Sequence, residues 1–191
     1  MIIPKQVSVL ESIETTAIKL FAERGIKDVT IKDIASEAKC SEGALYRHYK
    51  SKDEMAWSLY KREVEKFGRL VNKILDDRNL DFGKKISTSI ELFYSFYDSD
   101  PDKFSFILLS QYNFPRELKV NQKYNPYHQM EVLLKSVNRK KKPDHKLLTA
   151  MIFGLILEPA RMKAYNEIRG NLKNRTHIVY TAVINLIKFC G

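Results

Sequence analysis

Three helix-start signals fall within 22 residues of this chain and confine that stretch to a small packed helical unit. Thr30 and Ser51 are each followed three residues later by an acidic residue, which is the pattern of a capping box, and Ser41 is a third N-cap. The helices that these caps delimit, about 31–38 and 42–49, are too short to persist alone. They must therefore pack against a neighbour, as in a helix-turn-helix.

The rest of the 191-residue chain also carries helical patterns. Apolar residues recur at helical spacing over about 4–24, and Gly25 then supplies a helix end. We also expect a long helix over 53–76 and two further helices over 144–166 and 172–189. No segment alternates apolar and polar residues between hairpin turns. The sequence therefore predicts an all-α fold.

Composition excludes several classes of protein. Hydrophobic residues make up 44 % and charged residues 29 %, as in globular domains and unlike disordered chains. The longest apolar run, 150–157, is too short to cross a bilayer, and the first residues lack the pattern of a secretory signal. Cys40, Cys190 and the four histidines match no metal spacing. We expect a cytoplasmic protein with reduced thiols and no metal site.

The net charge of +10 suggests an anionic partner, but its distribution does not locate a DNA surface. Residues 1–52 hold nine basic and seven acidic side chains, and much of the remaining surplus falls in the basic run over 135–146. Such a run is typical of a solvated loop between helices. The alternative is a protein that binds DNA without sequence preference through this run. A DNA surface must therefore be located from a motif.

Residues 13–52 carry such a motif in three blocks. They read Leu-Phe-Ala-Glu-Arg-Gly-Ile over 20–26, Thr-Ile-Lys-Asp-Ile-Ala over 30–35, and Ser-Glu-Gly-Ala-Leu-Tyr-Arg-His-Tyr-Lys-Ser-Lys over 41–52. In order and spacing, the blocks closely resemble the N-terminal DNA-binding domain of the TetR family of bacterial transcriptional regulators. The C-terminal two-thirds of the chain carries no comparable motif.

One position departs from the family's pattern. The turn between the two short helices usually holds Gly and an apolar residue, and Lys39 and Cys40 take those places here. If the turn keeps its shape, Lys39 adopts a positive φ, which costs of order 1 kcal/mol for a residue other than Gly. Cys40 is expected to be a packed small residue rather than a redox sensor, because no second cysteine is near in sequence.

A helix that enters the major groove must present side chains to base edges. Arg47 suits guanine, and Glu42 suits the amino group of cytosine. The resemblance gives Tyr46, His48 and Lys52 the role of phosphate contacts, and helix N-termini also favour phosphate. The residues predicted to contact DNA are Thr30, Lys32, Ser41, Glu42, Gly43, Ala44, Tyr46, Arg47, His48 and Lys52.

Each of these assignments has a structural alternative. Leu45 and Tyr49 are expected in the core, because they lie on the face that packs against the first helix. His48 alone is also compatible with a core histidine bonded internally. Glu42 is equally explained as an acid that favours a helix N-terminus.

Eleven of the 21 aromatic residues lie within 82–127. Such a concentration forms either the core of a helical bundle or a pocket with apolar walls. The resemblance favours the pocket, because members of the family typically hold an inducer between the central helices. Glu158 is an alternative partner for the polar candidate Arg161. The residues predicted to bind a ligand are Tyr94, Tyr97, Tyr112, Tyr127, His128 and Arg161.

The last two predicted helices carry more apolar surface than one chain's core usually needs. In the family, the corresponding pair forms a four-helix bundle with its symmetry mate, which implies a homodimer here. A two-fold dimer would place two reading helices about one turn of DNA apart. The residues predicted at this interface are Leu148, Met151, Ile152, Leu155, Ile178, Ala182 and Leu186.

These inferences divide the chain into an N-terminal three-helix helix-turn-helix DNA-binding domain (1–52) and a C-terminal helical ligand-binding and dimerisation domain (53–191). The helix over 53–76 connects the two. The predicted function is a DNA-binding transcriptional regulator, a ligand-responsive repressor that binds a palindromic operator as a homodimer and takes a small apolar or aromatic effector.

An enzyme is not expected, because the sequence has no nucleophile elbow, glycine-rich phosphate loop, paired-acid motif or metal spacing, and no cofactor is predicted. The alternatives are the non-specific DNA-binding protein described above and a family member that responds to a protein partner. The latter would have a fully packed interior in the aromatic region. The sequence identifies neither the effector nor the operator, and it does not separate repressor from activator.

Overall fold

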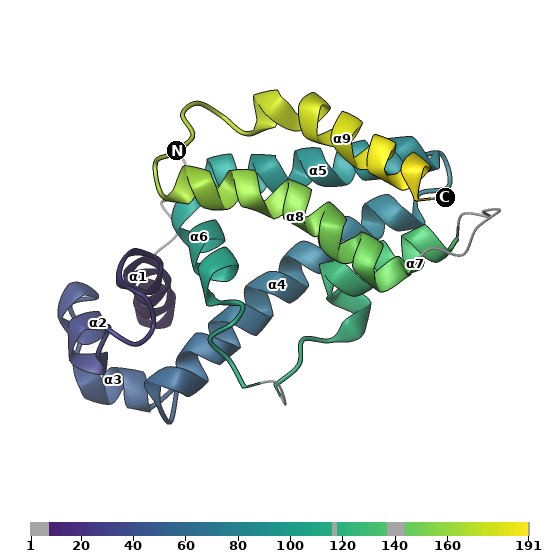
Figure 1. The fold of residues 1–191 in the computed structure, drawn as a ribbon. Helices are drawn as coiled ribbons and strands as arrows, with labels where there is room; N and C mark the ends of the chain where they lie inside the picture. The colour runs from purple at the N-terminus through teal and green to yellow at the C-terminus, as the bar shows by residue number, and fades with distance from the viewer. Residues whose placement is uncertain (1–7, 116–117, 137–143, 191) are drawn as a thin grey trace, which may run out of the picture.

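The computed structural model describes residues 8–115, 118–136 and 144–190, and within these ranges it contains helices and no strand. The all-α prediction is therefore confirmed. Figure 1 shows α1–α3 grouped at one end, the long α4 leading away from them, and the remaining helices gathered around its far part. The elements are α1 (Val9–Arg24), α2 (Ile31–Glu37), α3 (Glu42–Tyr46), α4 (Lys52–Asp76), α5 (Phe82–Ser99), α6 (Pro101–Ser110), η1 (Gln122–Tyr124), α7 (Pro126–Lys135), α8 (His145–Ala164), η2 (Lys173–Arg175) and α9 (Thr176–Phe189).

The first three helices share one apolar core. Phe21 of α1, Ile34 of α2 and Leu45 of α3 are 2 %, 0 % and 0 % exposed and belong to the same buried cluster. Gly25, at a φ of 81°, ends α1 where the sequence predicts. The predicted start of this helix near residue 4 lies outside the described residues, and the described part of α1 begins after the N-cap Ser8.

The helix α3 ends earlier than the sequence predicts. It spans Glu42–Tyr46 instead of 42–49. The backbone N–H groups of His48 and Tyr49 both donate to Leu45 O, at 2.9 and 3.0 Å. Such shared acceptance tightens a helix end and leaves the following residues in a turn. The chain then enters α4 after a short loop.

A second core lies among α5, α8 and α9. Ile86, Ile90 and Tyr94 of α5 are buried in it, and the Tyr94 hydroxyl donates to Ile156 O of α8 at 3.1 Å. The helix predicted from 172 begins four residues later, at Thr176. The residues before it form the single turn η2, whose entry is held by backbone N–H groups that donate to the carboxylate of Asp98.

Two helices take part in both halves of the molecule. Met55 and Leu59 near the start of α4 are buried in the N-terminal core, as is Phe106 of α6, which stacks on Phe21 with ring centroids 5.8 Å apart. Further along α4, Phe67 packs against Phe93 and Phe96 of α5. The N-terminal core therefore includes residues beyond 52, and the domain boundary at 52/53 stays a prediction.

Candidate functional site

The outer face of α3 is exposed to solvent, and a surface that reads DNA must be exposed in this way. Leu45 is fully buried and anchors the helix, whereas Tyr46 is 55 % exposed and Arg47 is also exposed. His48 is exposed as well, so the alternative of a core histidine is wrong. The N-cap Ser41 makes no side-chain hydrogen bond to the helix. The remaining predicted contacts on this helix are exposed Glu42 and Gly43 and half-buried Ala44.

The start of α2 lies beside this face and is built as the sequence predicts. Thr30 Oγ1 accepts from Asp33 N at 3.1 Å, and Thr30 N donates to Asp33 Oδ2 at 2.8 Å, which completes a capping box. The hydrogen bonds from Thr30 lower the pKa of Asp33 below its usual value. Thr30 and Lys32 are both exposed at this helix N-terminus, where they are available to an anion.

The turn between α2 and α3 keeps its shape despite the absence of glycine. Lys39 has a φ of 54°, so the predicted positive φ is confirmed. Cys40 N donates to Ala35 O at 3.0 Å, and the half-buried Cys40 side chain packs against the N-terminal core. The packed role predicted for Cys40 agrees with this position. The strain at Lys39 costs about 1 kcal/mol.

Lys52 has a different role from the predicted phosphate contact. Its ammonium group has three donors, and these reach the backbone oxygens of Ile26, Lys27 and Val29, the last at 2.7 Å. All three acceptors lie in the loop that joins α1 to α2. This arrangement corrects the prediction, because the ammonium holds the loop in place and has no donor left for a phosphate.

The carboxylate of Glu14 on α1 connects α4 to the unit formed by α1, α2 and α3, the recognition unit. Arg62 donates from Nη1 and Nη2 to the two oxygens of Glu14, each at 2.8 Å, and the Tyr49 hydroxyl donates to Glu14 Oε1. Burial alone would raise the pKa of Glu14, but the hydrogen bonds from Arg62 and Tyr49 outweigh it and leave this pKa lowered. Sequence reasoning missed this group, because its members are 35 and 48 positions apart and share no spacing pattern.

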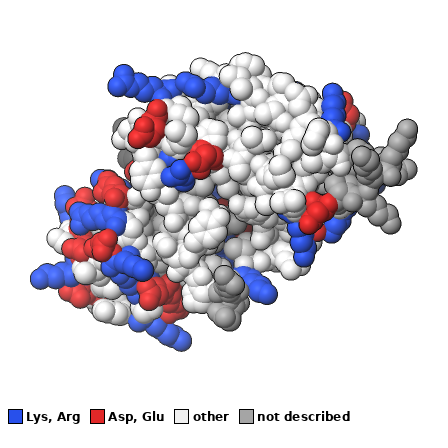
Figure 2. Space-filling view, viewed as in Figure 1, with Lys and Arg blue, Asp and Glu red and all other residues white. Residues whose placement is uncertain are grey.

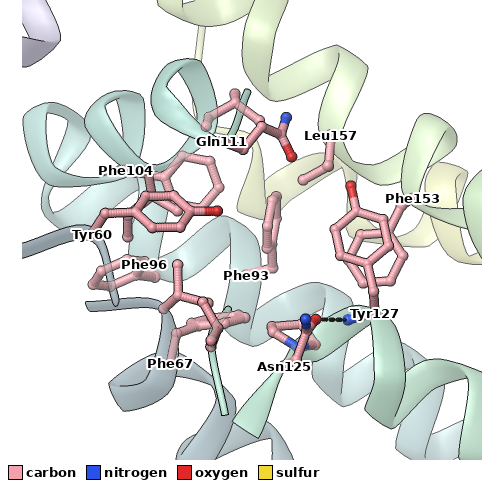
Figure 3. A pocket seen from close by; sticks show the side chains of 15 residues that line it. Tyr60, Phe67, Phe93, Phe96, Phe104, Gln111, Asn125, Tyr127, Phe153 and Leu157 are labelled. Atoms are coloured by element: carbon pink, nitrogen blue, oxygen red, sulfur yellow. Dashed lines mark hydrogen bonds between the residues drawn. The ribbon is translucent and has the colours of Figure 1, made fainter. Parts of the chain in front are cut away.

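An apolar cavity of about 120 Å³ lies among α4, α5, α6, α7 and α8. Figure 3 shows phenylalanine rings along its walls, with Phe93 and Phe104 in edge-to-face contact at 4.5 Å and Tyr127 stacked on Phe153 at 3.9 Å. Among the described residues, no Lys, Arg, His, Asp or Glu lines it. The lining residues are Tyr60, Val64, Phe67, Phe93, Phe96, Phe104, Ile107, Leu108, Gln111, Val120, Asn125, Pro126, Tyr127, Phe153 and Leu157.

Only one of the six residues predicted to bind a ligand lines this cavity, namely Tyr127. Tyr112, which is 86 % exposed, and Arg161 line an adjoining outer cleft, where Arg161 Nε donates to Glu158 at 2.8 Å. The other three do not line this cavity: Tyr94 and Tyr97 are buried in the core, and His128 is not among its lining residues. Sequence reasoning missed Tyr60 and Phe67, because both precede the aromatic-rich segment.

The single turn η1, whose flanking residues line the cavity, packs directly on α4. A Cβ added to Gly68 would lie 1.8 Å from Tyr124 O, so the backbone of η1 touches the helix where only glycine leaves room. Gln129 Nε2 bridges the two, donating to Gly68 O at 2.8 Å and to Lys123 O at 2.9 Å. Asn125, which ends η1 and caps α7, is itself a lining residue.

The outer faces of α8 and α9 carry exposed apolar side chains. Leu155 is 37 % exposed and Met151 44 %, and Ile178 of α9 is 59 % exposed. Leu148 and Ile152, which were predicted at the dimer interface, are 2 % and 0 % exposed and lie within this chain's own core. Ala182 and Leu186 are half-buried. Figure 2 shows charged side chains crowded over α1–α3 and few over the broad face that contains α8.

Two further properties concern the described part of the chain only. None of its helices combines the length and the apolar character that a membrane span requires. No cluster of three or more His, Cys, Asp or Glu side chains occurs among the described residues in an arrangement that suits a metal ion. Residues 139–142 of the predicted basic run lie outside the described residues, while Lys135 and Lys146 are exposed.

The sequence of the N-terminal region matches known proteins. Residues 13–58 match the model of a family described as bacterial regulatory proteins, tetR family. An HTH-type transcriptional regulator of Staphylococcus aureus (strain bovine RF122 / ET3-1) is 33 % identical over 72 residues, which make up 38 % of this chain and 39 % of that protein. The chain thus spans about 39 % of the length of the curated relatives it matches.

Solved structures match over nearly the whole chain. A TetR-like transcriptional regulator from Rhodococcus sp. RHA1 has a TM-score of 0.71 at 18 % identity and covers 98 % of this chain and 97 % of its own. The transcriptional regulator FadR from Bacillus subtilis, in complex with stearoyl-CoA, has a TM-score of 0.73 at 22 % identity, with 92 % and 97 % covered. At these identities the likeness shows a shared fold.

Proposed function

We propose that the chain is a sequence-specific, DNA-binding transcriptional regulator, and the match of residues 13–58 to the family of bacterial regulatory proteins, tetR family, supports this proposal. The observation that carries the proposal is the exposed face of α3, which is anchored by buried Leu45 and presents Arg47 and Tyr46 to the outside. A helix so placed enters the major groove with its first residues toward the base edges.

The side chains on this face divide into two roles. Arg47 reads a base edge, because a guanidinium bonds two acceptors of guanine at once. Tyr46, Thr30 and Lys32 contact phosphates, which position the protein without selecting a sequence. Lys52 supports this surface from behind by holding the loop before α2.

The protein acts as a homodimer that binds a palindromic operator. The exposed apolar side chains of α8 and α9, among them Met151, Leu155 and Ile178, support this assembly, because a second copy would bury them. A two-fold dimer presents two α3 helices to successive major grooves, and neither helix alone binds strongly enough to be selective.

A small effector in the apolar cavity changes the affinity for DNA. The supporting observation is that α4 and α6 serve both sites. Tyr60 and Phe67 of α4 line the cavity, while Leu59 of the same helix is buried in the N-terminal core. On α6, Phe104 lines the cavity, and Phe106, two residues on, stacks on Phe21 of α1. A ligand that shifts either helix therefore shifts the recognition unit, with a coupling of about 1–3 kcal/mol.

The test is a nuclease footprint of the purified protein on DNA upstream of its own gene, with competitor DNA at about physiological salt. We expect a bounded, roughly palindromic footprint. Arg47→Ala should cost about 1–3 kcal/mol and relax base preference, whereas Tyr46→Ala should weaken binding to all DNA. Tyr165→Ala is the matched control, because Tyr165 is 58 % exposed and lies at the end of α8, far along the chain from the motif.

Protection that is smeared along the DNA and lost with salt would contradict the proposal. So would a Tyr46→Ala variant that binds as tightly as the wild-type protein. If neutralising Lys135 and Lys146 abolished binding while Tyr46→Ala did not, the basic run would be the DNA-binding element instead.

A further inference from the structure

We propose that the cavity takes a compact, uncharged ligand with an apolar body and one carbonyl or hydroxyl oxygen, and that Tyr60, Tyr127 and Gln111 provide the hydrogen-bonding groups available to this oxygen. This inference rests on the proposed function, since it names the chemical class of the effector. Three observations carry it: the size of the cavity, the absence of charge in its wall, and the position of its polar groups.

The volume of the cavity limits the part of the ligand that it holds. The cavity measures about 120 Å³, and apolar protein cavities of roughly 150 Å³ bind benzene. A single ring or a short branched chain therefore fills it. An acyl chain of the length carried by the FadR neighbour, which was solved with stearoyl-CoA, is far larger than this space. The part of the ligand that this cavity holds is accordingly smaller than such an acyl chain.

The wall excludes a charged ligand. Its fifteen lining residues, taken from the described parts of the chain, include no cation to pair with a carboxylate and no anion to pair with an amine. An ionised group moved from water into such surroundings loses its hydration without compensation, which costs far more than the burial of a neutral polar group. The ligand is therefore neutral in its bound form.

The polar groups lie where the cavity opens. Gln111 lines the cavity and both outer clefts that adjoin it, Tyr60 borders one of these clefts, and Tyr127 borders the other. Figure 3 shows the Tyr60 oxygen and the Gln111 amide turned toward the interior, with the Tyr127 oxygen near Leu157. Phenylalanine rings, aliphatic side chains, Pro126 and Asn125 line the rest of the wall. A ligand thus enters with its ring inward and its oxygen at the opening.

These groups have hydrogen-bonding capacity to spare. Across the described residues, no protein group bonds to the hydroxyls of Tyr60 and Tyr127 or to the Gln111 side chain. Burial raises the pKa of Tyr60 to about 12, and burial together with the nearby Tyr112 and Tyr60 raises that of Tyr127 to about 12. Both phenols therefore remain protonated donors at neutral pH, and an oxygen acceptor on the ligand satisfies them.

The test compares three ring compounds of similar size by calorimetric titration of the full-length protein at pH 7 without DNA. Acetophenone carries one neutral oxygen, ethylbenzene carries none, and benzoate carries a charge. We expect acetophenone to bind with a Kd below about 1 mM, which is within the efficiency of small ligands. Benzoate should bind at least about tenfold more weakly, because its charge has no partner in the wall.

Variants assign the oxygen to its partners. Tyr60→Phe and Tyr127→Phe should each weaken the binding of acetophenone about 3- to 10-fold, the range expected for one hydrogen bond. Neither variant should change the affinity for ethylbenzene. Tyr165→Phe is the matched control, because this tyrosine lies outside the cavity. This variant should bind acetophenone and ethylbenzene with the affinities of the wild-type protein.

Several results would overturn the inference: no binding of acetophenone, equal affinity for benzoate, full affinity in both cavity variants, or tight binding of stearoyl-CoA alone. The proposed function is tested separately by adding acetophenone to the protein–DNA complex. If the compound binds the free protein with the expected preferences but leaves DNA binding unchanged, the ligand class stands and the coupling fails.

Discussion

Replacing Gly68 by alanine tests whether the cavity wall is fixed to α4 by direct backbone contact. A Cβ at this position would lie 1.8 Å from Tyr124 O and 2.6 Å from Tyr124 C. Both are backbone atoms, so no side-chain rotation relieves the overlap. The segment η1 must move away from α4, and the bridge that Gln129 makes between the two elements is strained with it.

The magnitude follows from three contributions. Overpacking costs about 1–3 kcal/mol, and the strained hydrogen bonds of Gln129 to Gly68 O and Lys123 O are worth about 1 kcal/mol each. Alanine in a helix interior recovers about 1 kcal/mol relative to glycine. The free energy of unfolding should therefore fall by about 2–4 kcal/mol, which lowers the Tm by roughly 4–16 °C for a chain of this size.

The assay is urea unfolding followed by circular dichroism, with thermal unfolding at the same protein concentration. Gly154→Ala is the matched control, because it makes the same change inside α8, where an added Cβ meets nothing within 4 Å. The control should be stabilised by up to about 1 kcal/mol. Equal behaviour of the two variants, or a Gly68→Ala protein as stable as the wild type, would refute the close contact between α4 and η1.

Three further predictions follow from the N-terminal unit. Lys39→Gly should raise the free energy of unfolding by about 1 kcal/mol, because glycine accepts a φ of 54° without strain. Phe106→Ala should lower it by about 3–5 kcal/mol, because the side chain is fully buried against Phe21. Glu14→Gln should lower the free energy of unfolding at neutral pH. The difference in this free energy from the wild type should shrink as the pH falls through the lowered pKa of Glu14.

The sign of the pH prediction follows from the direction of the shift. Because the pKa of Glu14 is lower in the folded protein than its ordinary value of 4.5, the unfolded chain takes up more protons as the pH falls. The stabilisation that ionised Glu14 gives to the folded protein is fully present above pH 4.5. It is lost as the pH falls through the lowered pKa of the folded state. Urea unfolding of both proteins over a pH series measures this, and a difference that grew on acidification would contradict the role given to Arg62. For Lys39→Gly, an unchanged stability would mean that the turn relaxes without strain.

Local signals in the sequence predicted the recognition unit well. Capping boxes join residues three positions apart, so Thr30 and Asp33 find each other in any context that allows a helix. The positive φ of Lys39 was predicted on the same local scale, from the shape of the turn. The family resemblance and the all-α fold depend on such short-range patterns.

The cavity and the joints between elements were decided by tertiary packing. Periodicity shows that a helix face is apolar, but it does not show which neighbour covers it. For this reason Leu148 and Ile152, which were predicted at the dimer interface, lie in this chain's core, while Tyr60, which precedes the aromatic-rich segment, lines the cavity.

The same reason explains the polar groups whose roles were missed. Lys52 reads as a surface cation in sequence, and only the fold brings the oxygens of Ile26 and Val29 to its ammonium group. Glu14 and Arg62 are 48 positions apart and meet because α1 packs across α4. The sequence by itself thus determined the all-α fold, the capping boxes and the motif that resembles the TetR family, because their signals are local. The tertiary structure alone decided the cavity and its connection to that motif, because both depend on contacts between residues distant in the chain.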